Sequence, residues 1–221
     1  SFNIFTESGK KIKDFTGGLG VLNHGHNHPK ILKTRIKFQE DKKIEVNKLT
    51  LSPYIAALGH NISNLLNKKL NKSYFSNSGA EANEGAIKMA YASYKKKRKY
   101  ILSSDDSFHG KLIATGSITG SLKHYDFPKM ENFDFFKYND FESLKNTVNN
   151  LNTPDNKCDV YAIIIEPFIA QRVFGFDEDF IQKTRKLCDD KDIRLIFDEV
   201  YCGWGKTGNL LAFQRYNVYP E

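Results

Sequence analysis

The sequence predicts an α/β fold, with a mostly parallel sheet flanked by helices. Helical and strand patterns alternate through most of the 221 residues, which is typical of βαβ units. Several strand candidates are unbroken apolar runs, as expected for parallel strands that are buried on both faces. The hydrophobic content of 40% excludes a disordered or fibrous chain. We expect residues 1–50 to form an N-terminal segment that leads into a large domain over residues 51–221.

The first elements predicted in the large domain are two helices and two strands. Ser52-Pro53 supplies an N-cap and a first-turn proline for a helix that continues to Leu66. A short strand is predicted over Lys72 to Ser76, a helix over Gly79 to Lys95, and a strand over Tyr100 to Ser103. The apolar face predicted for the second helix consists of Ala82, Ala86, Met89, Ala90 and Tyr94.

The second half of the large domain continues the alternation. Apolar residues at helical spacing predict helices over Phe141 to Leu151 and over Phe180 to Cys188. Buried strands are predicted over Val160 to Ile165 and over Ile193 to Phe197. The segment from Ser103 to Asn139 is the least regular, and its length predicts a functional loop or another short strand.

Composition excludes several classes of protein. The net charge of +7 comes from scattered basic residues, so we do not expect a nucleic-acid surface. No apolar run approaches the roughly 18 residues that a membrane helix requires, so no membrane contact is expected. The three cysteines are an odd number at spacings that fit neither a disulfide framework nor a zinc ribbon, which indicates reduced thiols in a cytoplasmic protein.

Two predicted strands lead directly into carboxylates. The run Ala162 to Ile165 is followed by Glu166, and Leu195 to Phe197 is followed by Asp198. Open α/β sheets bind their ligands at the carboxyl ends of strands. After three apolar residues Asp198 is expected to be nearly buried, and a buried ionised carboxylate needs a cation or a strong donor. The partner of Asp198 is either a ligand or, in a structural ion pair, a Lys or Arg from elsewhere in the chain.

The stretch from Ser76 to Asn83 joins a predicted strand to a helix through small residues. Its backbone N–H groups and the positive end of the helix are open to an anion, and a phosphate fits there. The alternative is that Asn77 or Ser78 only caps the helix.

Phe108-His109-Gly110 places an aromatic ring and an imidazole near the same sheet edge, where a planar ligand could stack. The alternative is that Phe108 fills the core and His109 is a satisfied histidine. Taken jointly, the phosphate loop, the aromatic ring and the buried acid describe a site for a flat phosphorylated cation.

Seven segments, which span essentially all of the chain, match one family. They are Asp14 to Gly18, Gly25 to Pro29, Ser76 to Asn83, Phe108 to Lys111, Ile164 to Pro167, Leu195 to Val200 and Gly203 to Gly208. In these segments the chain resembles the middle part of a class III aminotransferase, a pyridoxal-phosphate enzyme of fold type I. The resemblance implies the large domain of such an enzyme, incomplete at both ends.

The resemblance also implies a role for each site residue. Asp198 would face the pyridine nitrogen of pyridoxal 5'-phosphate and keep it protonated, so that the ring withdraws electrons. Val200 and Phe108 would pack on opposite faces of the ring. Asp198 is the implied catalytic residue, and the implied cofactor-binding residues are Ser78, Gly79, Ala80, Phe108, His109, Glu166, Asp198, Val200 and Tyr201. The alternating His24, His26 and His28 are explained as a structural turn, and no metal is expected.

The chain departs from the family at three positions. Tyr201 stands where many relatives have a Gln near the ring hydroxyl, and its phenol can donate a similar hydrogen bond. Gln171 stands where ornithine- and acetylornithine-type relatives have a Glu that pairs with a mobile arginine, so either substrate switching differs here or Gln171 is an exposed loop residue. Lys206, the only lysine after Asp198, matches the family's usual arginine and not the Schiff-base lysine.

Three explanations are open for the missing Schiff-base lysine. The chain is a fragment, one of two polypeptides that complete a site together, or a degenerate relative. We expect a fragment, and we expect the 221-residue chain alone not to catalyse transamination.

The function implied by the resemblance is transfer of an amino group from an amino acid or ω-amine to a keto acid, by a homodimer. A mutase, racemase or decarboxylase on the same scaffold is the nearest alternative, because the fold does not select the reaction. A non-catalytic or split subunit is the alternative from another class.

Overall fold

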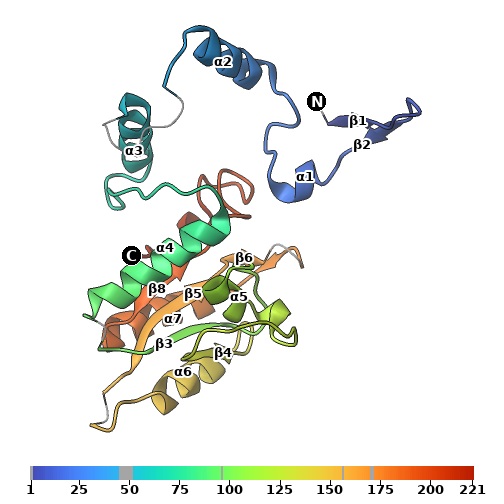
Figure 1. Cartoon of the computed structure of the whole chain (residues 1–221). Helices are drawn as coiled ribbons and strands as arrows, with labels where there is room; N and C mark the ends of the chain where they lie inside the picture. Colours follow the sequence, from blue (N-terminus) through green and yellow to red (C-terminus); the bar gives the residue numbers. More distant parts are fainter. Residues whose placement is uncertain (1, 45–51, 96, 156, 170–171) are drawn as a thin grey trace. The chain divides into compact units, whose positions relative to one another are not determined.

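The computed structural model describes residues 2–44, 52–95, 97–155, 157–169 and 172–221 (Figure 1). The chain divides into two compact units, Ser1–Ser73 and Tyr74–Glu221. The division predicted from the sequence, residues 1–50 and 51–221, concerns the bounds of the large domain in the family, and it stays a prediction.

The first unit is built from short elements. Strands β1 (Asn3–Phe5) and β2 (Lys11–Lys13) pair antiparallel, and helices α1 (Gly17–Gly20), α2 (Pro29–Glu40) and α3 (Pro53–Leu65) follow. Ser52 caps α3 as predicted, because its hydroxyl accepts a hydrogen bond from the backbone N–H of Ile55 at 3.4 Å. None of these three helices contains a buried residue in the part of the chain that is described.

The second unit contains a four-stranded parallel sheet, as predicted. The strand order is β4 (Phe133–Phe136), β3 (Tyr100–Ser104), β5 (Val160–Ile165) and β8 (Arg194–Phe197). All six residues of β5 are buried, because helices cover both faces of the central strands. Strand β4 is the short strand expected between residues 103 and 139.

Helices cover the sheet on two sides (Figure 1). Helices α4 (Gly79–Ser93) and α5 (Ile113–Ser117) pack on one face with Ala162 and Ile164. Helices α6 (Phe141–Asn150) and α7 (Glu178–Lys191) pack on the other with Ile163 and Ile165. This alternation follows from the two-residue period of a strand. The remaining elements are η1 (Gly120–Leu122), the antiparallel pair β6 (Phe168–Ile169) and β7 (Phe174–Gly175), and η2 (Ala212–Tyr216).

One prediction about local structure was wrong, and another was right only in part. Lys72 to Ser76 forms no strand, because no described segment pairs with it, and the Ser76 hydroxyl donates locally to the carbonyl of Ser78. The buried residues of α4 are Asn83, Ile87 and Ala90, so the predicted apolar face is right for Ala90, and Tyr94 packs against the core, whereas Met89 is 56% exposed. The apolar pattern did not include Asn83 because Asn83 is a polar amide.

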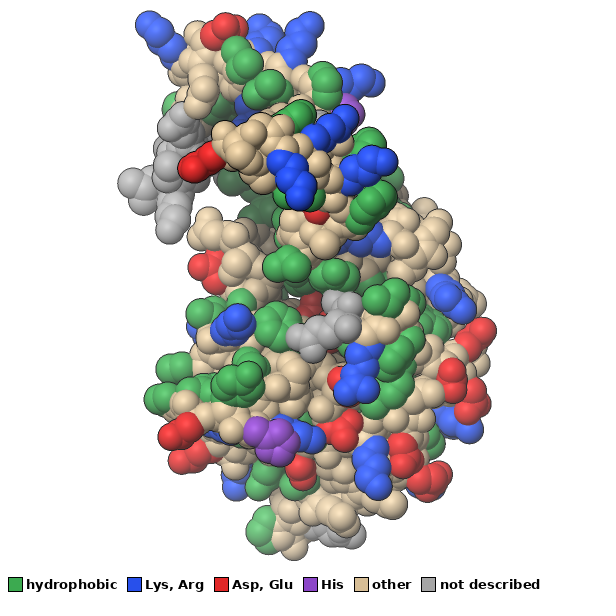
Figure 2. Space-filling view, turned by 90° about the vertical axis from the view of Figure 1, so that its right-hand side faces the viewer, with side chains coloured by type: hydrophobic (Ala, Val, Ile, Leu, Met, Phe, Trp, Pro, Cys, Tyr) green, Lys and Arg blue, Asp and Glu red, His purple; other side chains and the backbone are tan. Residues whose placement is uncertain are grey.

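Figure 2 shows both basic and acidic side chains on the face that it presents, together with exposed hydrophobic side chains. Among the described residues, no helix is long and apolar enough to cross a membrane.

Candidate functional site

The carboxyl ends of β3, β5 and β8 meet at one edge of the sheet. The backbone N–H of Asp198 donates to the carbonyl of Ile165 at 2.8 Å, which joins the ends of β8 and β5. The loop after β3 is joined to β5 where the backbone N–H of Phe108 donates to Glu166 Oε2 at 2.7 Å. Three of the predicted site segments therefore lie together, where an open α/β sheet binds its ligands.

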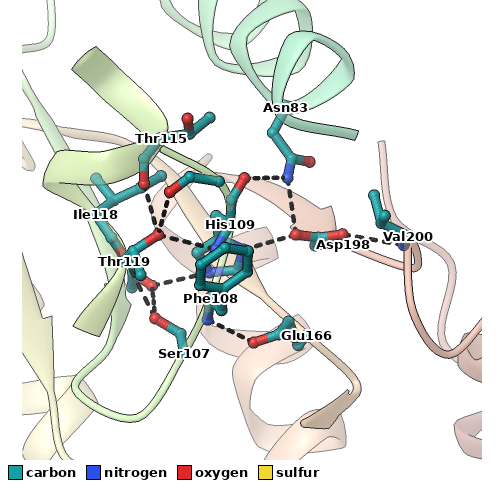
Figure 3. A network of polar contacts seen from close by, with 12 residues as sticks. Asn83, Ser107, Phe108, His109, Thr115, Ile118, Thr119, Glu166, Asp198 and Val200 are labelled. Atoms are coloured by element: carbon teal, nitrogen blue, oxygen red, sulfur yellow. Dashed lines mark hydrogen bonds and ion pairs between the residues drawn. The ribbon is translucent and has the colours of Figure 1, made fainter. Parts of the chain in front are cut away.

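Asp198 is the centre of a buried polar network (Figure 3). Its Oδ2 accepts hydrogen bonds from Asn83 Nδ2 at 2.7 Å and from His109 Nδ1 at 2.8 Å. Its Oδ1 accepts from the backbone N–H of Val200 at 3.0 Å. Among the described residues, no Lys or Arg forms an ion pair with Asp198, so the alternative of a structural Lys or Arg pair was wrong.

His109 is held at both ring nitrogens. Nδ1 donates to Asp198, because an ionised carboxylate can only accept. Nε2 lies 3.0 Å from the Ser103 hydroxyl, which in turn lies 3.0 Å from that of Ser107. The backbone N–H of His109 donates to Thr119 Oγ1 at 2.9 Å. His109 is 2% exposed and both of its ring nitrogens have partners, so it is a satisfied core histidine that contacts Asp198.

The hydrogen bonds leave one acceptor position on Asp198. A carboxylate has about four lone-pair sites, two on each oxygen. The two donors to Oδ2 use both sites on that oxygen, and Val200 uses one on Oδ1. Among the described residues, one position on Oδ1 therefore has no donor and can accept from a ligand.

The start of α4 offers backbone donors. Ser78 is the N-cap, and its hydroxyl accepts from the backbone N–H of Glu81 at 3.2 Å. The Glu81 carboxylate accepts from the backbone N–H of Asn77 at 2.7 Å. In the part of the chain that the structure describes, the backbone N–H groups of Gly79 and Ala80 have no partner. These two donors and the helix dipole suit an anion, so capping by Ser78 and anion binding are compatible.

Two glycines allow close approach beside the network. A Cβ at Gly79 would lie 2.6 Å from both methyl groups of Val200, so only a glycine fits there without a shift. Gly110 has φ +133°, and a Cβ there would lie 2.6 Å from the Cβ of Ala80. Val200, the residue that follows Asp198 by two positions, thus lies against the start of α4.

Phe108 lies in front of His109 in Figure 3, on the other side of Asp198 from Val200 in that view. Its ring is half-buried, and its backbone is fixed by Glu166, which is 4% exposed. Glu166 thus holds the Phe108 loop through the hydrogen bond that the structure shows.

Two other predicted residues lie apart from this network. The side chain of Tyr201 makes no described hydrogen bond to it, and its carbonyl accepts from Lys206 Nζ at 2.7 Å. The ammonium of Lys206 also lies 5.1 Å from the centre of the Tyr201 ring. Gln171 lies outside the described residues.

Neighbouring groups have pKa values that burial raises. Burial raises the pKa of the Cys202 thiol to about 12, so this thiol is not a nucleophile near neutral pH. Burial also raises the pKa of Glu199, against two backbone N–H donors, Ala212 at 2.6 Å and Phe213 at 2.8 Å. Glu199 thereby accepts hydrogen bonds from the start of η2, while the neighbouring Asp198 accepts hydrogen bonds from Asn83 and His109.

Comparison with known proteins decides the family. The model for Aminotransferase class-III matches residues 2–221. The chain belongs to the class III aminotransferase family. This result confirms the resemblance and the fold predicted from the sequence.

Among curated relatives, the class III chain is 37% identical to the acetylornithine aminotransferase of Methanocaldococcus jannaschii, over 99% of this chain and 54% of the relative. It is 36% identical to the succinylornithine transaminase of Photorhabdus laumondii, over 99% of this chain and 53% of the relative. The class III chain therefore spans about half the length of the curated relatives it matches.

Solved structures agree on the fold of the class III chain. The N-acetylornithine aminotransferase of Stenotrophomonas maltophilia matches with a TM-score of 0.81 at 26% identity, over 100% of this chain and 54% of that one. The taurine:2-oxoglutarate aminotransferase of Bifidobacterium kashiwanohense, in complex with PLP and glutamate, matches with a TM-score of 0.87 at 24% identity, over 99% of this chain and 53% of that one.

Proposed function

We propose that the protein is a pyridoxal-phosphate-dependent aminotransferase that moves an amino group from an amino acid or ω-amine to a keto acid. The observation that carries the proposal is the buried Asp198: within the described parts of the chain it keeps one acceptor position, and the nearby start of α4 has two N–H groups without a partner. Family membership and the names of the relatives support it.

The residues present fit the cofactor. Gly79 and Ala80 would donate to its phosphate, aided by the α4 dipole. Asp198 Oδ1 would accept from a protonated ring nitrogen, which supplies the cationic donor that a buried acid favours. When bound, pyridoxal phosphate withdraws electrons from the substrate carbon that loses a proton. Phe108 and Val200 would contact the ring, and Glu166 would hold Phe108 in place.

Four further residue assignments are part of the proposal. Ser78 would shape the anion site by capping α4, and His109 would hold Asp198 in its orientation. Tyr201 would contact the ring hydroxyl only after a change of its side-chain position, because its present contacts are with Lys206. Lys206 is assigned no covalent role because it stands where the family usually has an arginine, and its ammonium donates to the Tyr201 carbonyl.

We infer that the 221 residues alone do not transaminate. The reaction needs a lysine that moves a proton at the cofactor, and Lys206, at the position of the family's usual arginine, is not assigned that role. The chain also spans only about half of its relatives. The expected result is no turnover by the purified 221-residue chain with added pyridoxal phosphate, amine donor and keto acid. Measurable turnover overturns this inference.

The test of the proposed activity uses the protein at its full natural length, with pyridoxal phosphate. An N-acylated ornithine is the first donor to try, because the curated relatives act on such amines by name. Donor alone is expected to change the visible absorption of the cofactor, and a keto acid is expected to reverse the change. No spectral change with any amino acid or ω-amine contradicts the proposed activity.

A cytoplasmic homodimer is also part of the proposal. Within the first unit, the side chains of Phe15, Leu19 and Val21 are 87%, 78% and 74% exposed, which supports a covering protein surface. The three cysteines are free thiols, which supports a reducing compartment. Sedimentation at several protein concentrations is expected to give a dimer, and a monomer at all of them contradicts the assembly.

A further inference from the structure

Asn83 is a polar residue in an apolar stripe. It lies on the face of α4 that also buries Ile87 and Ala90, and it is 6% exposed. Placing an amide among apolar side chains is unfavourable unless its polar atoms are hydrogen-bonded. The Asn83 amide is therefore expected to have hydrogen-bond partners within the core.

Both hydrogens of the Asn83 amide are used. Nδ2 donates to the carbonyl of His109 at 2.9 Å and to Asp198 Oδ2 at 2.7 Å. Both partners can only accept, so the chemistry fixes which end of the amide carries the nitrogen. Asn83 thereby joins three segments that lie far apart in the sequence, α4, the loop after β3 and the end of β8 (Figure 3).

The two donors to Oδ2 orient the carboxylate. With Asn83 and His109 on Oδ2, the acceptor position that remains is on Oδ1. Asn83 lies one helical turn after Gly79, whose backbone N–H belongs to the proposed anion site. The same rigid helix therefore presents donors to a phosphate and holds the acid that would meet the ring nitrogen.

We propose that Asn83 is a positioning residue that sets the spacing between the anion site and Asp198 and stabilises the ionised form of that acid. This inference rests on the proposed function and deepens it. A hydrogen bond to a carboxylate favours its charged form, so loss of the Asn83 donor favours transfer of the proton from the ring nitrogen to Asp198.

The test replaces Asn83 in the full-length protein by Leu, which fills a similar volume, and by Ala. Ser93→Ala is the control, because it removes a hydroxyl at the far end of the same helix, where Ser93 Oγ donates to the carbonyl of Ala90 at 2.7 Å. Binding of pyridoxal phosphate is measured by fluorescence titration. The protonation of its ring nitrogen is measured by NMR with nitrogen-15 in the ring.

Both Asn83 variants are expected to bind pyridoxal phosphate about tenfold more weakly or worse, as for a lost hydrogen bond to a charged group. Their ring nitrogen is expected to lose its proton at lower pH than in the wild type, while S93A behaves as wild type. A purely structural role moves affinity without moving the nitrogen signal, and that result overturns the inference.

Other outcomes are equally decisive. Wild-type affinity and nitrogen signal in a folded N83L protein also overturn the inference. If N83A does not fold, the result for N83L decides the test. Asn83→Ser keeps a hydrogen-bond donor and is expected to restore part of the protonation of the ring nitrogen. No restoration in this variant counts against the inference. If the wild type itself binds no pyridoxal phosphate, the proposed function fails, which is distinct from failure of the Asn83 role.

Discussion

The ends of β5 and β8 carry the same sequence pattern and use it differently. Each strand leads from buried apolar residues into an acid, and Glu166 and Asp198 are 4% and 5% exposed. Glu166 has the longer side chain and accepts from the backbone of Phe108. Asp198 is shorter, meets side-chain donors from two other segments, and keeps an acceptor position. An apolar run followed by an acid therefore marks the edge of a site, while the donors around each acid decide its role.

The largest effect is expected from Asp198→Asn. The amide keeps the size of the side chain, but it removes the charge that would hold the ring nitrogen protonated. We expect kcat of the full-length protein to fall on the order of a hundredfold to a thousandfold, the usual cost of removing a preorganised electrostatic partner. Steady-state kinetics check this, with circular dichroism to confirm folding. If D198N and E166Q lose the same activity, the distinction between the two acids is wrong.

The next effect concerns the close approach of α4 to the segment after β8. In Gly79→Ala the new Cβ would lie 2.6 Å from the Val200 methyl groups. Alanine favours helix, so any loss comes from this clash, which we expect to cost about 1–3 kcal/mol of unfolding free energy. Urea denaturation measures it, and Val200→Ala in the same protein is expected to restore stability.

A matched control for Gly79 is Gly59 in α3. A Cβ at Gly59 would lie 3.7 Å from Ser73 Oγ, an ordinary contact. We expect G59A to be neutral or to stabilise by up to about 1 kcal/mol. A loss in G59A as large as in G79A, or no rescue by V200A, would show that the clash with Val200 is not the cause.

Glu166→Gln is expected to have a smaller effect. The amide oxygen can still accept from the Phe108 backbone, but the bond loses its charge assistance. We expect the free energy of unfolding to fall by about 1 kcal/mol, with less than fivefold change in the affinity for pyridoxal phosphate. Thermal denaturation and fluorescence titration check the two values. A large loss of affinity with unchanged stability would place Glu166 with Asp198 as a ligand-facing acid.

Much of the fold could be predicted because burial on both faces leaves a strong local signal. Val160 to Ile165 is an unbroken apolar run, and it forms β5 with the predicted bounds. Lys72 to Ser76 was predicted as a strand from its local pattern, but strand pairing depends on a neighbour that the pattern does not contain.

A site residue could be predicted only where its residue type and its neighbours in the sequence indicate a role. Asp198 and His109 stood out as an acid and an imidazole at strand ends, and the structure joins them at 2.8 Å. Asn83 is the last residue of the small-residue stretch and carries no such local signal. Its partners lie 26 and 115 residues away, so its contacts depend on tertiary packing. The available signal was an amide at helical spacing from Ile87 and Ala90.

The smallest effect is expected from Glu199, the acid next to Asp198. Burial raises the pKa of Glu199 in the folded protein above the ordinary value of 4.5, which applies to the unfolded protein. Between 4.5 and the higher pKa of the folded protein, the folded state therefore binds more protons than the unfolded state. Stability contributed by this group is therefore present below pH 4.5 and is lost as pH rises through the folded pKa. Glu199→Gln is expected to flatten this decline, measured as urea midpoints from pH 4.5 upward in wild type and variant. An unchanged slope would show that the N–H groups of Ala212 and Phe213, which donate to the Glu199 carboxylate, offset the effect of its burial.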